Sequence, residues 1–355
     1  MFKINTDQGI YFFDNTRNQL VEEKDAKFLC PNKARFEDQT VKIQKFNYHN
    51  NTNFLHPNNI ETLDVVVNGN EIEKILGFVK TIGKLNFKNL RKIRLFGNNS
   101  WDTSTTLIPK LRGLYPSIEI RLFEDGKEFD DELSDFCMSY KILVELNGDI
   151  KPICFKHQNV RAIVPVEPNL DKLVNDYRTK YLKNVPISIQ FPYCKISKFT
   201  NEDIETLRQT TVDCGMFHLK TNIHDMVERY RKSFEDPTRP YETTGDCHSS
   251  VGKQVAVDLN CSVYRCHEDK EPIGNIETFF DGSHAIKHLY PWWERPHCLN
   301  CIHLSFCGGG CPKLSQNEHK IFCNARKAYL DGILRLVFWL HYGSKVISVE
   351  EVQSV

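Results

Sequence analysis

The chain has 355 residues, enough for two or three domains and at least one full-sized hydrophobic core. Its 46 basic and 46 acidic side chains give a formal net charge of zero, which argues against a nucleic-acid-binding protein and against a polybasic membrane-surface segment. The N-terminus lacks the apolar core of a signal peptide, and the apolar run at 336–340 is too short to span a bilayer. We therefore expect a soluble, cytoplasmic protein with no nucleic-acid or membrane partner.

Residues 1–57 are expected to form an N-terminal β element whose role the sequence does not reveal. Two short apolar segments, 10–13 and 19–21, flank a polar stretch of Asp, Asn, Thr and Arg, a pattern typical of a β-hairpin. The stretch 49–59 is rich in Asn and contains a proline, which is typical of a linker.

Residues 58–240 alternate between strand and helix patterns. Apolar residues from Ile72 to Val79 follow the spacing of one helix face, and the same spacing recurs at 170–181. Strands that alternate with helices predict a parallel sheet, and six strands are too few for a closed eight-stranded barrel. We therefore predict an α/β fold built on a degenerate partial (β/α)6 TIM-type barrel. The six expected strands are 63–67, 93–96, 118–123, 142–146, 162–166 and 187–191.

Helix starts can be placed at two points in the barrel segment. Thr200 precedes Asp203 by three residues, which is the spacing of a capping box. Ser104 and Thr105 stand upstream of Pro109, and we expect another helix to begin there. Two more helices are expected over 224–235 and over the strongly apolar segment 324–342.

Cysteine is unusually frequent, with 13 in the chain and eight of them close together near the C-terminal end. Without an export signal, this density points to metal ligands rather than disulfides. Eight thiolates suffice for two sites of four, which suit either two [4Fe–4S] clusters or two zinc ions. Three glycines, 308–310, allow positive φ and close backbone approach between two of the cysteines, with a plain tight turn as the alternative. The eight cysteines are Cys247, Cys261, Cys266, Cys298, Cys301, Cys307, Cys311 and Cys323.

The spacing of these cysteines points to a known module. From the fourth cysteine onward it reads Cys-x2-Cys-x5-Cys-x3-Cys, and the last cysteine follows after eleven residues. Together with an expected hairpin over 255–266, this layout resembles the SPASM domain, the C-terminal auxiliary-cluster module of radical S-adenosylmethionine peptide-modifying enzymes. The resemblance implies an iron–sulfur SPASM domain over 241–324, followed by a C-terminal helix and tail over 325–355. Over the barrel segment the resemblance is only architectural.

The resemblance implies two ligand sets. Cluster one would take Cys247, Cys266 and Cys311. The family has glycine where this chain has Cys261, so Cys261 is either the fourth ligand of cluster one or a turn residue beside an open iron. Cluster two would take Cys298, Cys301, Cys307 and Cys323.

An active radical S-adenosylmethionine enzyme needs a third cluster, held by a Cys-x3-Cys-x2-Cys loop after the first barrel strand. The sequence has no such motif, because the pair Cys307 and Cys311 would need a cysteine where Leu314 stands. Residues 92–99 resemble the second barrel strand of these enzymes, yet they end in Gly97-Asn98-Asn99 rather than Gly-Gly-Glu. We interpret this end as a plain strand-to-helix loop. We expect no S-adenosylmethionine site and no cleavage of that cofactor by this chain alone.

These observations predict a pseudo-radical-SAM protein with two [4Fe–4S] clusters. It would be an accessory partner in the maturation of a ribosomally made peptide, binding the precursor peptide or a radical maturase, with electron relay as one use of its clusters. The alternatives are a stand-alone redox enzyme that acts through an open auxiliary cluster, and a scaffold stapled by two zinc ions. The neighbouring His248, His297 and His303 are interpreted as surface or packing residues.

Overall fold

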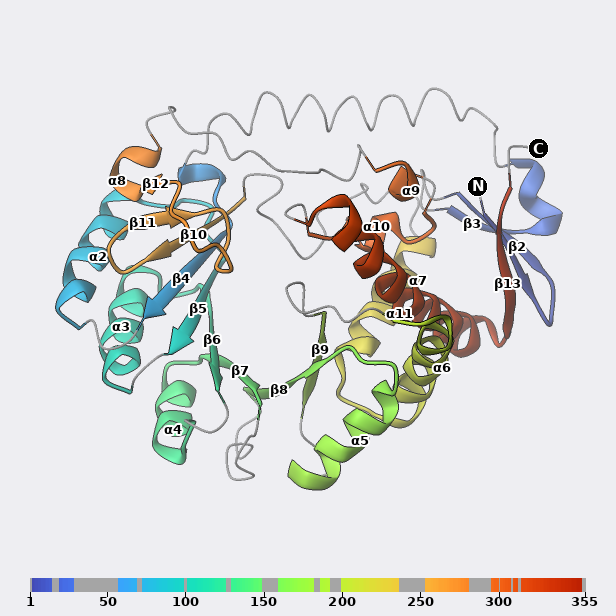
Figure 1. The fold of residues 1–355 in the computed structure, drawn as a ribbon, viewed down its shortest axis with the longest axis horizontal. Helices are drawn as coiled ribbons and strands as arrows, with labels where there is room; N and C mark the ends of the chain where they lie inside the picture. Colours follow the sequence, from blue (N-terminus) through green and yellow to red (C-terminus); the bar gives the residue numbers. More distant parts are fainter. Residues whose placement is uncertain are drawn as a thin grey trace.

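Among the residues that the computed structural model describes, two β-sheets organise the chain (Figure 1). One has nine strands in the order β12-β11-β10-β4-β5-β6-β7-β8-β9, and the other has four in the order β13-β1-β2-β3. The structure describes residues 2–14, 19–28, 57–68, 72–98, 101–125, 129–148, 159–181, 186–191, 199–235, 253–280, 295–299, 301–307, 309–311 and 314–352.

Six parallel strands of the large sheet confirm the predicted partial barrel. In the first of them, the side chains that face the covering helices are fully buried: Leu63, Val65 and Val67. Asp64 points to the opposite face, because successive side chains of a strand alternate between the two faces of the sheet. We call that opposite face the inner face. The six strands are β4 (Thr62–Asn68), β5 (Lys92–Asn98), β6 (Glu119–Asp125), β7 (Leu143–Asn147), β8 (Val160–Pro165) and β9 (Ile187–Gln190).

Helices cover the outer side of this sheet (Figure 1). In the first of them, Ile75, Phe78 and Ile82 are buried, which is the spacing of one helix face. The predicted helix start at Ser104 is wrong, because the helix begins earlier, at Trp101, and it contains Pro109. The covering helices are α2 (Ile72–Leu85), α3 (Trp101–Leu114), α4 (Asp131–Ser139) and α5 (Leu170–Tyr181).

The large sheet continues past β4 into the cysteine-rich part of the chain. Strand β10 (Gln254–Asp258) pairs with β4 in parallel, and β11 (Ser262–Tyr264) and β12 (Gly274–Asn275) follow antiparallel. The predicted hairpin over 255–266 is therefore present as β10 and β11. The sheet runs across the domain boundary that the sequence predicts at residue 240. Helix α8 (Ile276–Phe279) follows β12 directly.

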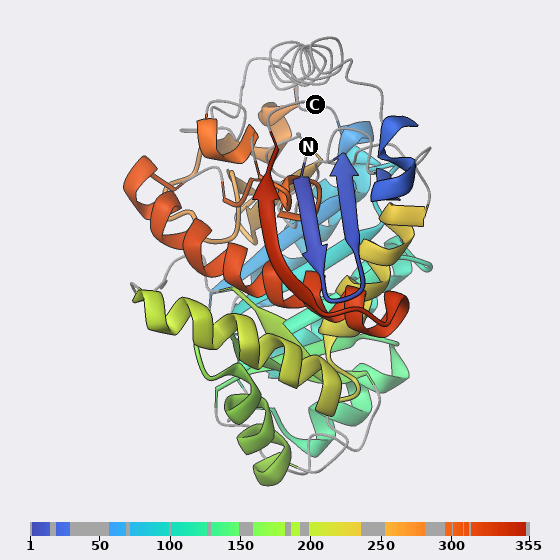
Figure 2. The ribbon, with the colours of Figure 1, turned by 90° about the vertical axis from the view of Figure 1, so that its right-hand side faces the viewer.

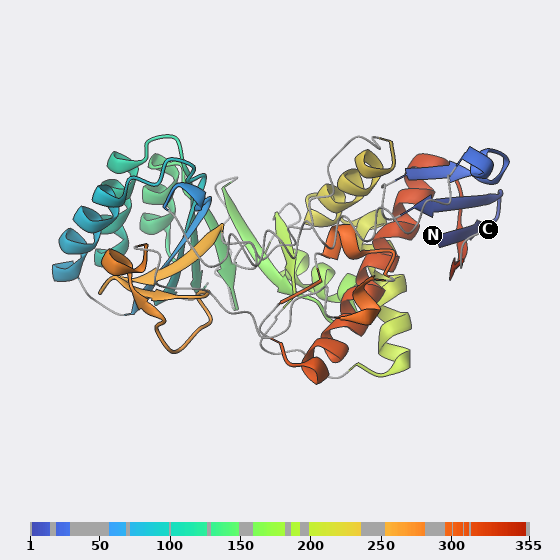
Figure 3. The same ribbon diagram turned by 90° about the horizontal axis from the view of Figure 1, so that it is seen from above.

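Three more helices stand beside the β9 end of the sheet (Figure 3). They are α6 (Asn201–Phe217), α7 (Asn222–Glu235) and α11 (Gln316–Tyr342). The predicted capping box of Thr200 and Asp203 begins α6. Helix α11 begins earlier than its apolar pattern predicts, because Ser315 and Glu318 form a second capping box.

The two ends of the described chain share the small sheet (Figure 2). The predicted hairpin is present, with Phe13 opposite Leu20, and Ile4 pairs across to Val349 near the C-terminus. Phe13 contacts Phe234 of α7 at a ring separation of 5.0 Å, which fastens the sheet to the helices. The strands are β1 (Phe2–Thr6), β2 (Ile10–Asp14), β3 (Gln19–Glu22) and β13 (Val346–Glu351), and the 3-10 helices η1 (Glu23–Phe28) and η2 (Pro57–Asn59) follow β3.

None of the helices in the described segments is both long enough and apolar enough to cross a membrane.

The crossing of α6 and α11 provides a test of the packing. A methyl group on Gly332 would lie 2.6 Å from Cβ of Thr211 and 2.7 Å from the carbonyl oxygen of Arg208, so the helices would have to separate. We expect Gly332→Ala to lower the free energy of unfolding by about 2 kcal/mol in urea titrations. Gly113→Ala is the matched control, because a methyl group there meets nothing within 4 Å. Equal stability of the two variants would contradict the close crossing.

Candidate functional site

Four of the predicted ligands come together where two short helices meet α11. Cys298 lies in α9 (Pro296–Leu299), Cys307 ends α10 (Leu304–Cys307), Cys301 lies between these helices and Cys323 lies on α11. In every pair of the four, the negative charge of one sulfur acts on the other. These four residues, the set expected for cluster two, lie near enough for their charges to act on one another, and we call them the Cys tetrad; their role as ligands stays a prediction.

Three of the tetrad thiols, those of Cys298, Cys301 and Cys323, resist ionisation when no cation is bound. Burial, reinforced by the charges of Cys307 and Cys323, raises the pKa of Cys298. Burial also raises the pKa of Cys301 to about 12 and that of Cys323 to about 11. At neutral pH these groups are neutral thiols, and a metal centre that binds them displaces their protons. The chemistry of this donor set therefore fits a thiophilic metal centre.

The part of the chain that carries Cys298, Cys301 and Cys307, which we call the tetrad segment, contains short turns and is followed by a glycine loop. The amide of Cys301 donates to the carbonyl oxygen of Cys298 at 3.1 Å, and the amide of Cys307 donates to that of His303 at 2.7 Å. Gly309 and Gly310 have φ values of 79° and 71°, which favour glycine. A methyl group on Gly310 would also lie 2.6 Å from the ring of Phe322. The predicted positive φ is thus confirmed at 309 and 310, while residue 308 lies outside the described residues.

A buried chain of hydrogen bonds fixes the tetrad segment to two helices. The hydroxyl of Tyr230, on α7, donates to Nδ1 of His303 at 2.9 Å. Nε2 of His303 donates to Asp331, on α11, at 2.7 Å, and Arg208 of α6 approaches the same carboxylate at 3.4 Å. His303 is 1% exposed and both its ring nitrogens are engaged, so it is a packing residue, as the sequence predicts. His248 lies outside the described residues.

Two histidines, His297 and His319, lie beside Cys298 and hydrogen-bond each other. His319, on α11, donates from Nε2 to the carbonyl oxygen of Gly309 at 2.8 Å. Its Nδ1 therefore accepts from Nε2 of His297 at 3.0 Å. Burial, together with the charge of Arg295, lowers the pKa of His319 to about 4 and keeps its ring neutral. His319 belongs to no cysteine spacing pattern, although it lies one helical turn before Cys323 on α11.

The residues predicted for cluster one are less completely described. Cys247 lies outside the described residues, Cys266 follows β11, and Cys311 follows the glycine loop. Among the described residues, no three donor atoms that include these cysteines lie within 4.8 Å of one another. The ligand set of cluster one stays a prediction.

Cys261 occupies a strained turn position. Its φ of 65° lies in the left-handed region, and its amide donates to the carbonyl oxygen of Asp258 at 3.0 Å to close the β10–β11 turn. A residue other than glycine held in this conformation costs roughly 1–3 kcal/mol. Its thiol hydrogen-bonds Thr81 of the covering helix α2. The position that holds glycine in the SPASM pattern thus has the backbone of a glycine here.

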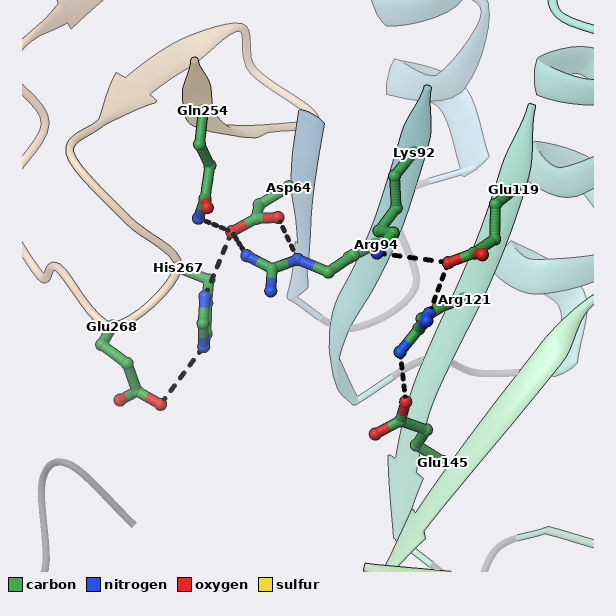
Figure 4. Close-up of polar contacts among 9 residues, drawn as sticks. All are labelled: Asp64, Lys92, Arg94, Glu119, Arg121, Glu145, Gln254, His267 and Glu268. Carbon is green, nitrogen blue, oxygen red and sulfur yellow. Dashed lines mark hydrogen bonds and ion pairs between the residues drawn. The ribbon is translucent and has the colours of Figure 1, made fainter. Parts of the chain in front are cut away.

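The inner face of the sheet carries a buried carboxylate with several donors (Figure 4). Asp64 of β4 is fully buried and accepts from Nε and Nη2 of Arg94 at 2.7 and 2.8 Å. Gln254 of β10 donates to it at 2.8 Å, and Nδ1 of His267 lies at 3.2 Å. Burial alone would raise the pKa of Asp64, but Arg94 and His267 outweigh it and lower the pKa. The ring of His267 also stacks on Phe96 at 3.8 Å.

Alternating charges continue across the neighbouring strands (Figure 4). Glu119 of β6 pairs with Lys92 of β5 at 3.4 Å and with Arg121 at 2.6 Å. Arg121 reaches Glu145 of β7 at 2.8 Å, and Gln190 of β9 donates to Glu145 at 2.6 Å. Parallel strands covered on both faces are usually apolar throughout. These charges mark the inner face as the polar side of the barrel, which the sequence analysis did not identify.

Comparison with known proteins supports the fold alone. No family model and no curated protein sequence matches the chain. Among solved structures it resembles native anSMEcpe with bound AdoMet, a radical S-adenosylmethionine enzyme with a SPASM domain. The TM-score is 0.52 at 14% sequence identity, over 79% of this chain and 99% of that chain. The predicted partial barrel followed by a cysteine-rich C-terminal region is therefore confirmed as a fold.

The ion pair on the inner face predicts how stability responds to acid. Because the pKa of Asp64 is lower in the folded chain than in the unfolded chain, its stabilising effect is present above its ordinary pKa and is lost as the pH falls through the folded value. Asp64→Asn leaves the Arg94 guanidinium without its charge partner, and we expect the free energy of unfolding at pH 7 to drop by about 3 kcal/mol. Urea titrations from pH 7 to pH 3 should then show a smaller acid-induced loss in the variant than in the wild type.

Glu205→Gln is the control for this experiment. It removes an ion pair between Arg208 and a carboxylate that is 65% exposed, and pairs of this kind contribute roughly 0–1 kcal/mol. If Asp64→Asn were as stable as Glu205→Gln at pH 7, the inner-face pair would not stabilise the fold as argued.

Proposed function

We propose that this chain is an iron–sulfur protein with two [4Fe–4S] clusters that serves as an accessory partner in radical-SAM-dependent maturation of a ribosomally made peptide. The observation that carries the proposal is the Cys tetrad, four thiols from three segments that interact in every pair. The tetrad would hold cluster two, and Cys247, Cys266 and Cys311 would hold cluster one. Bound clusters would supply one-electron chemistry.

The spacing of the tetrad favours a cluster over zinc. Zinc holds four sulfurs at about 2.3 Å from one ion, so those sulfurs lie within about 4 Å of one another. Within the described part of the chain, His297, Cys298 and His319 are the one trio of donor atoms within 4.8 Å of each other. No three sulfurs of the tetrad are as close as a zinc site requires. In a [4Fe–4S] cluster each thiolate binds a different iron, which suits sulfurs that stand farther apart.

The residues of this chain around the tetrad would hold it in place and exclude water. Tyr230, His303 and Asp331 form a hydrogen-bonded chain that joins α7 to α11 through the tetrad segment. The ring of Tyr230 stacks on Phe306 at 3.4 Å, which places an apolar wall beside the sulfurs. A dry wall of this kind controls solvent access to a metal centre and thereby its reduction potential.

The segments after the first two barrel strands support an accessory role. Between β4 and α2 the sequence is Gly-Asn-Glu, so the catalytic cluster loop of a radical S-adenosylmethionine enzyme has no cysteines there. At the end of β5, Gly97 has a φ of 107°, and a methyl group on it would lie 2.0 Å from the carbonyl oxygen of Val67. Close strand packing accounts for this glycine without a cofactor. We propose that the chain binds the precursor peptide or the maturase and relays electrons to it.

The metal content tests the cluster proposal. We expect about eight irons and eight acid-labile sulfides per chain after anaerobic reconstitution, and about half as many in Cys307→Ala. Cys214→Ala is the control, because Cys214 is fully buried on α6 and belongs to neither predicted set. About two zinc ions with no sulfide would instead identify a zinc-stapled scaffold. Loss of iron in the control equal to that in Cys307→Ala would contradict the ligand assignment.

The geometry of Cys261 favours a second candidate function, a stand-alone redox enzyme that uses an open iron of cluster one. The left-handed φ and the contact with Thr81 suit a turn residue rather than a ligand. Cys261→Gly relieves the backbone strain, and we expect it to keep the iron and sulfide of the wild type. Loss of iron in this variant would identify Cys261 as a ligand and close the open-site route.

Association tests the accessory role. The tagged chain, purified anaerobically from its native host, is expected to recover a protein that contains a Cys-x3-Cys-x2-Cys motif, or the short precursor peptide of that maturase. Mass spectrometry identifies what is bound. Recovery of neither from cluster-loaded protein would contradict the accessory role and leave the redox enzyme as the stronger candidate.

A further inference from the structure

A fully buried arginine lies at the junction of the two predicted ligand sets. Arg295 is 0% exposed and precedes α9, where its carbonyl oxygen accepts from the amide of Cys298 at 2.9 Å. Its Nη1 donates to the carbonyl oxygen of Gly309, and its Nη2 donates to that of Cys311 at 3.2 Å. The guanidinium therefore spans the loop between Cys307 of the tetrad and Cys311 of cluster one.

The charge of Arg295 acts on the sulfurs as well as on the loop. The charge is held beside the ligands, because the amide of Cys298 donates to the carbonyl oxygen of Arg295 and the guanidinium donates to the carbonyl oxygen of Cys311. Lys327 lies four residues after Cys323 on α11, but its side chain is exposed to solvent. A buried charge is screened far less than an exposed one. Of these two positive charges, Arg295 is the one withdrawn from solvent.

Reduction of a cluster adds one electron and makes the site more negative. A fixed positive charge nearby stabilises the reduced form more than the oxidised form, and charge and hydrogen bonding around the sulfurs set the potential of such clusters. Arg295 meets the first condition, because it carries a charge, and it also holds the backbone between two ligands.

We propose that Arg295 sets the reduction potential of the cluster that the Cys tetrad holds, as a positioning residue that touches neither iron nor substrate. The inference rests on the proposed function. It assigns to this residue the task of keeping cluster two reducible in a buried site. The electron comes from an external donor, for which dithionite serves in the test.

The test is a dithionite titration of the reconstituted full chain, followed by electron paramagnetic resonance. The signal that remains in Cys266→Ala belongs to the tetrad cluster. Arg295→Gln keeps an amide donor but removes the charge, and we expect reduction to become about tenfold less favourable, which is a fall of about 59 mV for a one-electron couple. Iron and sulfide should stay at wild-type levels.

Two further variants separate charge from structure. Arg295→Lys keeps the positive charge but loses the paired hydrogen bonds to the carbonyl oxygens of Gly309 and Cys311. The reduction potential of the cluster should therefore stay closer to the wild-type value in Arg295→Lys than in Arg295→Gln. Lys327→Gln removes the exposed charge, and we expect its shift to shrink as salt is added, whereas the shift in Arg295→Gln should persist.

Several results would overturn the proposal. One is an unchanged potential in Arg295→Gln, and another is a shift in Arg295→Gln that added salt abolishes, as it would for an exposed charge. Loss of iron from Arg295→Gln would also overturn it, because Arg295 would then assemble the site rather than set its potential. Absence of iron from the wild type is a separate outcome, which refutes the proposed function before any variant is compared.

Discussion

The gathering of four cysteine thiols beside α11 is the constraint on which the cysteine-rich part of this structure depends. Burial and neighbouring charges oppose ionisation of Cys298, Cys301 and Cys323. These thiols therefore lose their protons only when a positively charged metal centre binds them. The residues around the tetrad supply positive charge and hold the tetrad segment in place. A buried arginine supplies charge, neutral His319 fixes the glycine loop, and the Tyr230–His303 hydrogen bond holds the segment against the helices.

The sequence predicted the elements whose signals are local. Strand alternation located all six parallel strands, and the Thr200 capping box located the start of α6. Pairings between distant segments have no such signal. The parallel pairing of β10 with β4 and the pairing of β13 with β1 join residues far apart in the sequence, so a residue pattern in one segment does not specify its partner. The start of α11 had a local signal, the Ser315 capping box, which the apolar pattern obscured.

The residues of the candidate site also divide into those that a local sequence pattern predicts and those that it does not. Cysteine spacing, interpreted through a family resemblance, was enough to name the tetrad, because ligands to one centre recur at characteristic intervals. Arg295 and Asp64 carry no spacing signal, and their importance arises from burial and from partners on other strands or loops. Asp64 and Arg94 are opposite each other only in the register of β4 against β5, which the sequence does not contain as a pattern. The polar inner face therefore required the folded structure.

The terminal sheet has a consequence for the order in which this protein matures. Strand β1 is synthesised long before its neighbour β13, and contacts so distant in sequence form late. Helix α11 connects that strand to Cys323, so closure of the small sheet and capture of the fourth sulfur involve the same helix. Cofactor loading and completion of the fold thus become one late event rather than two independent ones.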